Sequence, residues 1–150
     1  MNTTAFTIYD ASAGSGKTYT LTKEYLKILF LATNDDAYRK ILAITFTNKA
    51  VEEMKTRIVS SLYQFSLDNT SDKAMELLKD VASETKLSIA TLKDKSKAII
   101  KNIIHNYAAF DISTIDKFTH KVIRTFAQDL NLPPNFEVSL ETDSLLQEAI

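Results

Sequence analysis

Both glycines of this 150-residue chain lie in one short stretch, Ala11-Ser12-Ala13-Gly14-Ser15-Gly16-Lys17-Thr18. A main chain that wraps around a phosphate group must expose several neighbouring N–H groups, some in left-handed conformations that a side chain at Gly14 or Gly16 would obstruct. A helix that begins at Lys17 would also direct its partly positive N-terminus at the same phosphates. The stretch therefore predicts a phosphate-binding loop that opens a helix.

The alternative is that the string GSGKT occurs by chance at an ordinary helix start. Average residue frequencies put the chance of this string in such a chain on the order of 1 in 10,000. Residues 6–9 alternate like a β-strand before the stretch, and Leu21, Tyr25 and Ile28 form a helical stripe after it. Strand, loop and helix in this order are the context in which a P-loop occurs.

A P-loop gives each residue of the stretch a task. The main-chain N–H groups contact nucleotide phosphates, the Lys17 ammonium reaches the β and γ phosphates, and the Thr18 hydroxyl binds the Mg²⁺ ion between them. Lys17 and Thr18 are therefore the predicted catalytic residues. The predicted nucleotide-binding residues are Ala11, Ser12, Ala13, Gly14, Ser15, Gly16, Lys17, Thr18 and Tyr19.

Composition indicates one domain with an ordinary core, since 45% of the residues are hydrophobic. The longest apolar run, 25–32, is interrupted by Lys27 and is too short to span a membrane, so a cytoplasmic location is expected. The chain has no cysteine, which excludes disulfides and thiolate zinc sites. The first 128 residues carry 18 cationic and 14 anionic side chains, a mildly basic balance that permits nucleic-acid contact without requiring it.

Hydrophobic periodicity predicts strands that alternate with helices. The predicted strands are 6–9, 41–44 and 110–115, and the predicted helices begin at Lys17 and after residue 48. Alternation of this kind predicts an α/β fold, a partial parallel sheet with helices on both faces. The residues expected on inward helix faces are Val51, Met54, Ile58, Leu62 and Phe65, and later Phe118, Val122, Ile123 and Phe126.

Residues 68–109 interrupt this alternation with two helical stretches, 73–82 and 88–107. They predict an inserted helical hairpin whose inward residues are Leu92, Ile99, Ile100, Ile103 and Ile104. Lys93, Lys95, Lys97 and Lys101 on its second helix form either a basic binding face or a solvated one. A last helix begins at Thr142 without an end signal, which predicts a fragment of a larger protein unless the C-terminus is naturally frayed.

Two further segments carry a family resemblance. Residues 41–58, ILAITFTNKAVEEMKTRI, together with ASAGSGKT, resemble the UvrD and RecB type helicases of superfamily 1. Their first motif takes the form AxxGxGKT, so Ala11 fits this family although the general P-loop pattern has glycine there. Residues 113–118, STIDKF, followed by Arg124, are similar to the family's TxHxF motif, with Asp116 in place of histidine. The loop and the TID form are closest to RecB-like or AddA-like helicase-nucleases.

The resemblance implies a RecA-like P-loop NTPase that binds ATP and Mg²⁺ between two RecA-like domains and moves along single-stranded DNA as ATP is hydrolysed. The implied partners are DNA, the remainder of the same polypeptide and an AddB/RecC-like subunit, and the implied role is in DNA repair. The resemblance also assigns DNA contacts to Thr45, Phe46, Thr47, Asn48 and Thr114. In this interpretation a base stacks on Phe46; ordinary packing at a strand end is the alternative.

Carboxylates limit what the chain is expected to do. Asp116 either replaces a DNA-contacting histidine, where it would repel phosphate, or caps a helix that begins at Lys117. No apolar strand is followed by the Asp-Glu pair that holds Mg²⁺ and activates water in helicases, so the segment alone is expected to be nearly inactive. A small P-loop metabolite kinase and a non-catalytic nucleotide-binding module remain alternatives. The kinase would need lid arginines, and none follows Arg124.

Overall fold

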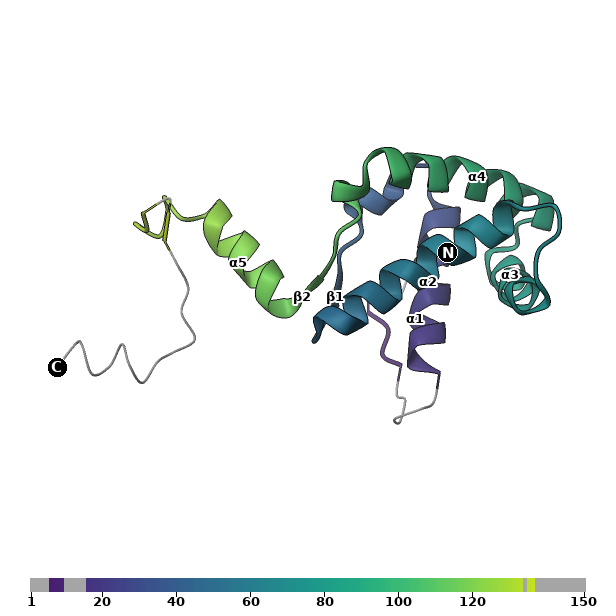
Figure 1. Ribbon diagram of the computed structural model, residues 1–150, viewed down its shortest axis with the longest axis horizontal. Helices are drawn as coiled ribbons and strands as arrows, with labels where there is room; N and C mark the ends of the chain where they lie inside the picture. The colour runs from purple at the N-terminus through teal and green to yellow at the C-terminus, as the bar shows by residue number, and fades with distance from the viewer. Residues whose placement is uncertain (1–5, 10–15, 134, 137–150) are drawn as a thin grey trace. The chain divides into compact units, whose positions relative to one another are not determined.

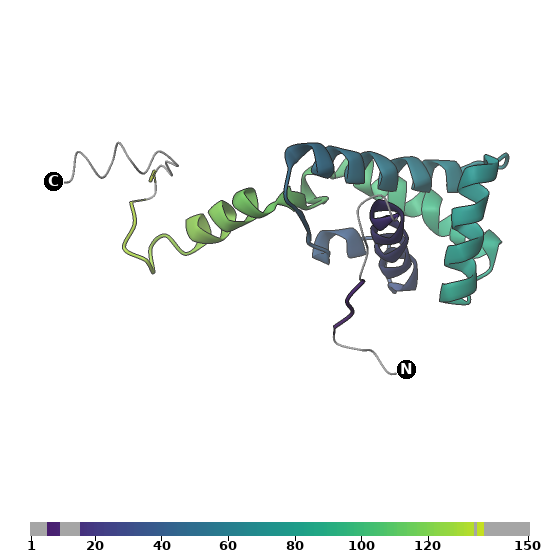
Figure 2. The same ribbon diagram turned by 90° about the horizontal axis from the view of Figure 1, so that it is seen from below.

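The structure, a computed structural model, describes residues 6–9, 16–133 and 135–136 (Figures 1 and 2). Most of the P-loop and the helix predicted from Thr142 lie outside these residues. The chain divides into two units, 1–114 and 115–150. The elements are α1 (Lys17–Leu31), η1 (Ala37–Lys40), β1 (Ala43–Thr45), α2 (Asn48–Ser66), α3 (Asp72–Thr85), α4 (Ile89–His105), η2 (Tyr107–Ala109), β2 (Ile112–Thr114) and α5 (Ile115–Thr125).

A short parallel sheet confirms the predicted parallel pairing for two of the three predicted strands. β1 and β2 pair with Ala43 opposite Ile112 and Thr45 opposite Thr114. α2 contacts both strands and lies between them in the chain, as a crossover helix does in a parallel pair. Ile112 is buried on one face of the sheet, whereas Ile44, on the opposite face, is 44% exposed. Helices on both faces are therefore not found in the described part of the chain.

The strand predicted at 6–9 is absent from the structure. Residues 6–9 belong to no strand, and Phe6 and Ile8 are each 78% exposed. Alternation favours an extended segment, but a strand also needs a neighbouring strand to pair its main-chain N–H and C=O groups. In the described part of the chain, β1 and β2 pair with each other and not with residues 6–9. Alternating side chains alone were therefore not enough to make this segment a strand.

The core of the first unit forms where α2 meets α1 and α4. All five residues of the predicted α2 stripe are buried, which confirms the inward face of that helix. On α1 the prediction was only partly right, because Tyr25 is buried but Leu21 and Ile28 are exposed. The inward face of α1 is instead rotated toward Leu26, Leu29 and Phe30.

The helical hairpin is confirmed with slightly different bounds, as α3 and α4. Ser88 caps α4 by accepting a hydrogen bond of 3.1 Å from the Thr91 main-chain N–H. Ile99 and Ile103 are buried as predicted, but Ile104 is 65% exposed, because it lies one residue beyond the inward stripe. α4 packs against α2 and shares its core, so the hairpin is integral to the first unit.

Two lysines of α4 bind the C-terminal ends of other helices. The Lys93 ammonium donates to the carbonyl oxygens of Leu67, at 2.7 Å, and Asp68, at 3.1 Å, where α2 ends. The Lys95 ammonium donates to those of Phe30, at 2.8 Å, and Ala32, at 2.7 Å, where α1 ends. A cation at these carbonyls satisfies main-chain acceptors and offsets the helix dipole. Both predicted roles, binding face and solvated face, are therefore wrong for Lys93 and Lys95.

Replacing Lys95 with methionine should lower the free energy of unfolding by about 1–2 kcal/mol, because the apolar stem is kept while two hydrogen bonds of a charged donor are lost. The matched control is Lys97→Met on the exposed side of the same helix, expected to stay within about 0.5 kcal/mol of the parent. Urea denaturation followed by circular dichroism measures both. Equal stability of the two variants would contradict the capping role.

Side-chain bonds join α1 to α3. The Glu84 carboxylate accepts from Lys23 and Lys27, both at 2.6 Å. The Tyr19 hydroxyl donates to Asp80, also at 2.6 Å. These groups are partly exposed, so each bond adds little to stability, but together they fix α3 beside α1.

The second unit contains α5, whose predicted apolar face is not covered. Phe118 and Ile123 are half-buried, whereas Val122 and Phe126 are exposed, and no residue of α5 is buried. The Arg124 guanidinium lies 5.9 Å from the centre of the Phe136 ring. Among the described helices of the two units, none has the length and apolar character needed to cross a membrane.

Candidate functional site

The carboxyl ends of the two strands gather several predicted site residues. Thr45 and Thr114 are register partners at the last position of β1 and β2. Figure 1 shows that α1 and α2 both begin at this same end of the first unit. Ligands of α/β folds bind where strands end and helices begin, because main-chain N–H groups are free there. Lys17 and Thr18, which open α1, and the turn after β1 therefore lie toward the same end of the first unit.

The start of α1 has the geometry of an anion site. Gly16 precedes the helix with φ of 80°, the left-handed conformation predicted for a P-loop glycine. No side chain caps α1 and no acidic residue lies in its first turn, within the described residues. The N–H groups of the first turn therefore lack partners there. The Ala11–Ser15 part of the predicted loop lies outside the described residues.

The side chains at the start of α1 fit a triphosphate with its magnesium ion. Lys17 is exposed and forms no ion pair within the described residues, and Thr18 is half-buried. The Thr18 hydroxyl makes no hydrogen bond to another described residue, while its carbonyl accepts from the Thr22 hydroxyl at 2.7 Å. An ammonium and free N–H groups donate hydrogen bonds to phosphate oxygens, and a hydroxyl oxygen is a ligand that Mg²⁺ accepts.

Tyr19 has a different environment from its neighbours. Its hydroxyl is held by Asp80 on α3. Burial, together with this hydrogen bond, raises the pKa of Tyr19 to about 12. The Tyr19 side chain therefore contacts α3. At the start of α1, Tyr19 offers a phosphate only its main-chain N–H.

The turn after β1 presents one large ring to solvent. Thr47 caps α2 by accepting from the Ala50 N–H at 3.1 Å, and the Thr45 hydroxyl donates to the Thr47 carbonyl at 3.2 Å. These bonds fix the turn on either side of Phe46, whose side chain is 87% exposed. Packing of Phe46 at the strand end, the alternative left open by the sequence, is therefore wrong. Asn48, the first residue of α2, is exposed as well.

Thr114 and Asp116 differ in their surroundings. Thr114 is only 5% exposed, at the end of β2 and beside Thr45. Asp116 is exposed in the first turn of α5, because that helix begins at Ile115 rather than at Lys117. The carboxylate thus lies inside the helix rather than before it, where it still interacts favourably with the helix dipole.

One face of α5 was missed at the sequence level. Lys117, His120, Lys121, Arg124 and Thr125 line a shallow hollow in the second unit. The sequence does indicate this face, since these positions recur at spacings of three and four. The apolar residues of the same segment recur in the same way, and only they were interpreted. Three cations and a histidine on one helix face suit contact with a phosphate backbone.

The acidic half of an ATPase site is not found in the described part of the chain. Neither β1 nor β2 is followed by an Asp-Glu pair. Within the same residues, no three His, Asp or Glu side chains are grouped closely enough to hold a metal ion. The described site therefore contains groups of the kind that phosphate-binding sites use, but not the carboxylates that would complete hydrolysis.

Comparison with known proteins agrees with this geometry. The family model of the UvrD/REP helicase N-terminal domain matches residues 3–150. Similar curated proteins include an ATP-dependent helicase/nuclease subunit from Lactobacillus acidophilus, 32% identical over 131 residues or 87% of this chain. The protein of the same name from Bacillus cytotoxicus is 29% identical over 141 residues, or 93% of the chain, and that of a Thermoanaerobacter species is 29% identical over 136 residues, or 91%.

The chain spans only 9% of the length of each of these relatives. No solved structure matches it. The family model nevertheless covers the P-loop, the turn after β1 and the TID segment together, in the order in which the sequence carries them. The chain belongs to the UvrD/REP helicase N-terminal domain family.

Proposed function

We propose that this chain is the ATP-binding, N-terminal part of an ATP-dependent DNA helicase and nuclease that couples ATP hydrolysis to translocation along single-stranded DNA and to unwinding, in DNA repair. The observation that carries the proposal is the uncapped start of α1, with Gly16 left-handed before Lys17 and Thr18. Relatives named as ATP-dependent helicase/nuclease subunits support the choice among P-loop activities.

In this proposal the start of α1 binds the nucleotide. N–H groups of the first turn and the main chain of residues 11–15 contact the phosphates, and the Lys17 ammonium neutralises the outer phosphate charge. The Thr18 hydroxyl would help to hold Mg²⁺, which when bound would supply positive charge beside the phosphate oxygens. The carboxylates that complete the site would come from the remainder of the polypeptide, together with its second RecA-like domain.

DNA lies, in the same proposal, across the turn after β1. The Thr47 hydroxyl and the Asn48 amide donate to phosphates near the start of α2, while a base stacks on Phe46. The Thr45 hydroxyl donates to the Thr47 carbonyl and so holds this turn in place. Thr114 is buried beside Thr45, so its role in this proposal is to hold the end of β1 in position from the neighbouring strand. The exposed ring supports this interpretation over a metabolite kinase, because a small phosphate acceptor has no use for an aromatic platform that is 87% exposed.

The basic face of α5 adds a second contact to the DNA backbone. An AddB/RecC-like subunit is the proposed protein partner, by analogy with relatives that are themselves named as one subunit of a helicase/nuclease. A cytoplasmic location belongs to the same proposal, because ATP and DNA are both present there in bacteria such as those that encode the relatives.

Replacing Phe46 with alanine tests the DNA-binding role. We expect the affinity for a fluorescent thymidine oligonucleotide to fall between about fivefold and 150-fold, the range for losing one stacked base. Fluorescence anisotropy at low and moderate salt measures it. Since stacking releases no counterions, the salt dependence of binding should be unchanged.

The matched control is Tyr63→Ala, an exposed aromatic residue near the other end of α2. It should bind the oligonucleotide like the parent, and Phe46→Trp should restore most of the affinity because tryptophan offers a larger ring. Parental affinity in Phe46→Ala would remove the stacking role and leave only phosphate contacts at this turn.

A further inference from the structure

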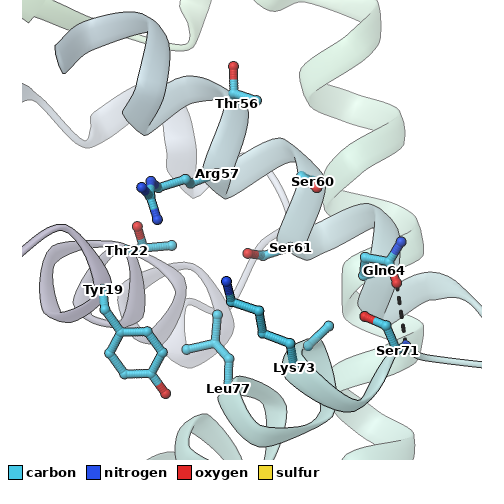
Figure 3. A pocket seen from close by; sticks show the side chains of 11 residues that line it. Tyr19, Thr22, Thr56, Arg57, Ser60, Ser61, Gln64, Ser71, Lys73 and Leu77 are labelled. Carbon is cyan, nitrogen blue, oxygen red and sulfur yellow. Dashed lines mark hydrogen bonds between the residues drawn. The ribbon is translucent and has the colours of Figure 1, made fainter. Parts of the chain in front are cut away.

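A hollow of about 320 Å³ lies between α1, α2 and α3 of the first unit. It is open to solvent, and its lining combines polar side chains of α2 with residues from the first turns of α1 and α3. Figure 3 shows the Arg57 guanidinium and the Lys73 ammonium reaching toward the same space from α2 and α3, with Thr22 and Ser61 beside them. Neither the P-loop nor the turn after β1 forms this surface.

The charges of the hollow are unbalanced. Its lining contains two cations and no carboxylate. Within the described residues, Arg57 and Lys73 form no ion pair, although Lys23 and Lys27 nearby are both paired with Glu84. Two unpaired cations that face each other across a concave surface repel, so an anion between them would be bound favourably.

Neutral donors complete the lining. Thr56, Ser60 and Ser61 line the hollow from α2, and none of their hydroxyls makes a hydrogen bond to another described residue. Ser71 precedes α3 and also lines the hollow; its side chain makes no capping bond, and its N–H donates to the Gln64 side chain at 3.4 Å. Hydroxyl and main-chain N–H groups next to cations are the donors that phosphate oxygens accept from.

The rest of the hollow is apolar, formed by Leu77, Ala74 and the ring of Tyr19. A single phosphate group would occupy only part of the volume, and the apolar wall would contact whatever the phosphate is attached to. We propose that this hollow binds a phosphate ester, with Arg57 and Lys73 on the phosphate and the sugar or base against Leu77. The proposal does not rest on the proposed helicase activity, because it uses none of its site residues except the Tyr19 side chain.

The test is a ¹H–¹⁵N NMR titration of the 150-residue chain carrying Lys17→Ala, which removes the main cation of the P-loop. Inorganic phosphate, thymidine monophosphate and a thymidine oligonucleotide are the three probes. We expect saturable shifts of the Ser61 and Ala74 amides and of the Arg57 side-chain N–H. Arg57→Gln and Lys73→Gln should each weaken thymidine monophosphate binding about tenfold, the usual effect of losing one charge-assisted hydrogen bond.

Lys101→Gln is the matched control, since Lys101 is an exposed lysine of α4 outside the hollow. It should change the affinity less than twofold, and Arg57→Lys should recover part of what Arg57→Gln loses. Stronger binding of the oligonucleotide than of the monophosphate would identify a nucleic-acid strand as the source of the phosphate, and the reverse a free nucleotide. The proposal is overturned if the hollow's resonances do not shift, or if Arg57→Gln and Lys101→Gln have the same effect.

Discussion

Replacing Lys17 with alanine should lower the rate of ATP hydrolysis by the full-length protein at least about a hundredfold, the usual cost of removing one preorganised group that stabilises transition-state charge. The side chain is exposed at the start of α1, so the fold should be unaffected. Its ammonium is expected to contact the β and γ phosphates, where negative charge accumulates as the terminal phosphate leaves. The value of kcat/KM for ATP with saturating DNA is the measurement.

The control for Lys17→Ala is Lys97→Ala, an exposed lysine on α4, which should hydrolyse ATP like the parent. The 150-residue chain alone is not suitable material, because we expect it to be nearly inactive without an Asp-Glu pair at a strand end. Hydrolysis by Lys17→Ala within a few fold of the parent would contradict the proposed function. It would leave the phosphate-binding hollow between α1, α2 and α3 untouched, because that proposal is tested in a Lys17→Ala background.

Patterns that repeat within one element were the part of this fold that the sequence could predict. The start of α1 follows from the glycine-rich loop before it, and the buried face of α2 follows from apolar spacings of three and four, which need no knowledge of the partner surface. Parallel pairing of β1 with β2 follows from the helices between them. Likewise, the left-handed Gly16 follows from the chemistry of a loop that only glycine can form easily.

Contacts between distant residues could not be predicted in the same way. Lys93 and Lys95 bind carbonyls 26 and 65 residues away, and no spacing along α4 reveals that those helix ends lie beside it. The hollow between α1, α2 and α3 depends equally on a meeting of elements, since Arg57 and Lys73 lie on different helices. In the sequence, the hollow was indicated only by the polar face of α2. Any half-exposed helix has such a face, so this pattern does not predict a binding site.

Phe65→Ala should be the most destabilising of these changes, at about 3–5 kcal/mol, because it removes a buried ring and leaves a cavity in the core. The side chain is fully buried near the end of α2, and its ring lies 6.4 Å from that of Phe30 on α1. A loss of this size is a large share of the stability of an ordinary domain. Urea denaturation of the 150-residue chain, followed by circular dichroism, measures it.

The control for Phe65→Ala lies two residues away on the same helix. Tyr63 is exposed, so Tyr63→Ala should cost less than about 1 kcal/mol, while Phe65→Leu should lose less than Phe65→Ala because it fills part of the cavity. α2 carries the turn with Phe46 at its start and the core with Phe65 near its end. If Phe65→Ala were no worse than Tyr63→Ala, the packing of α2 on α1 would be wrong, and with it the hollow between them.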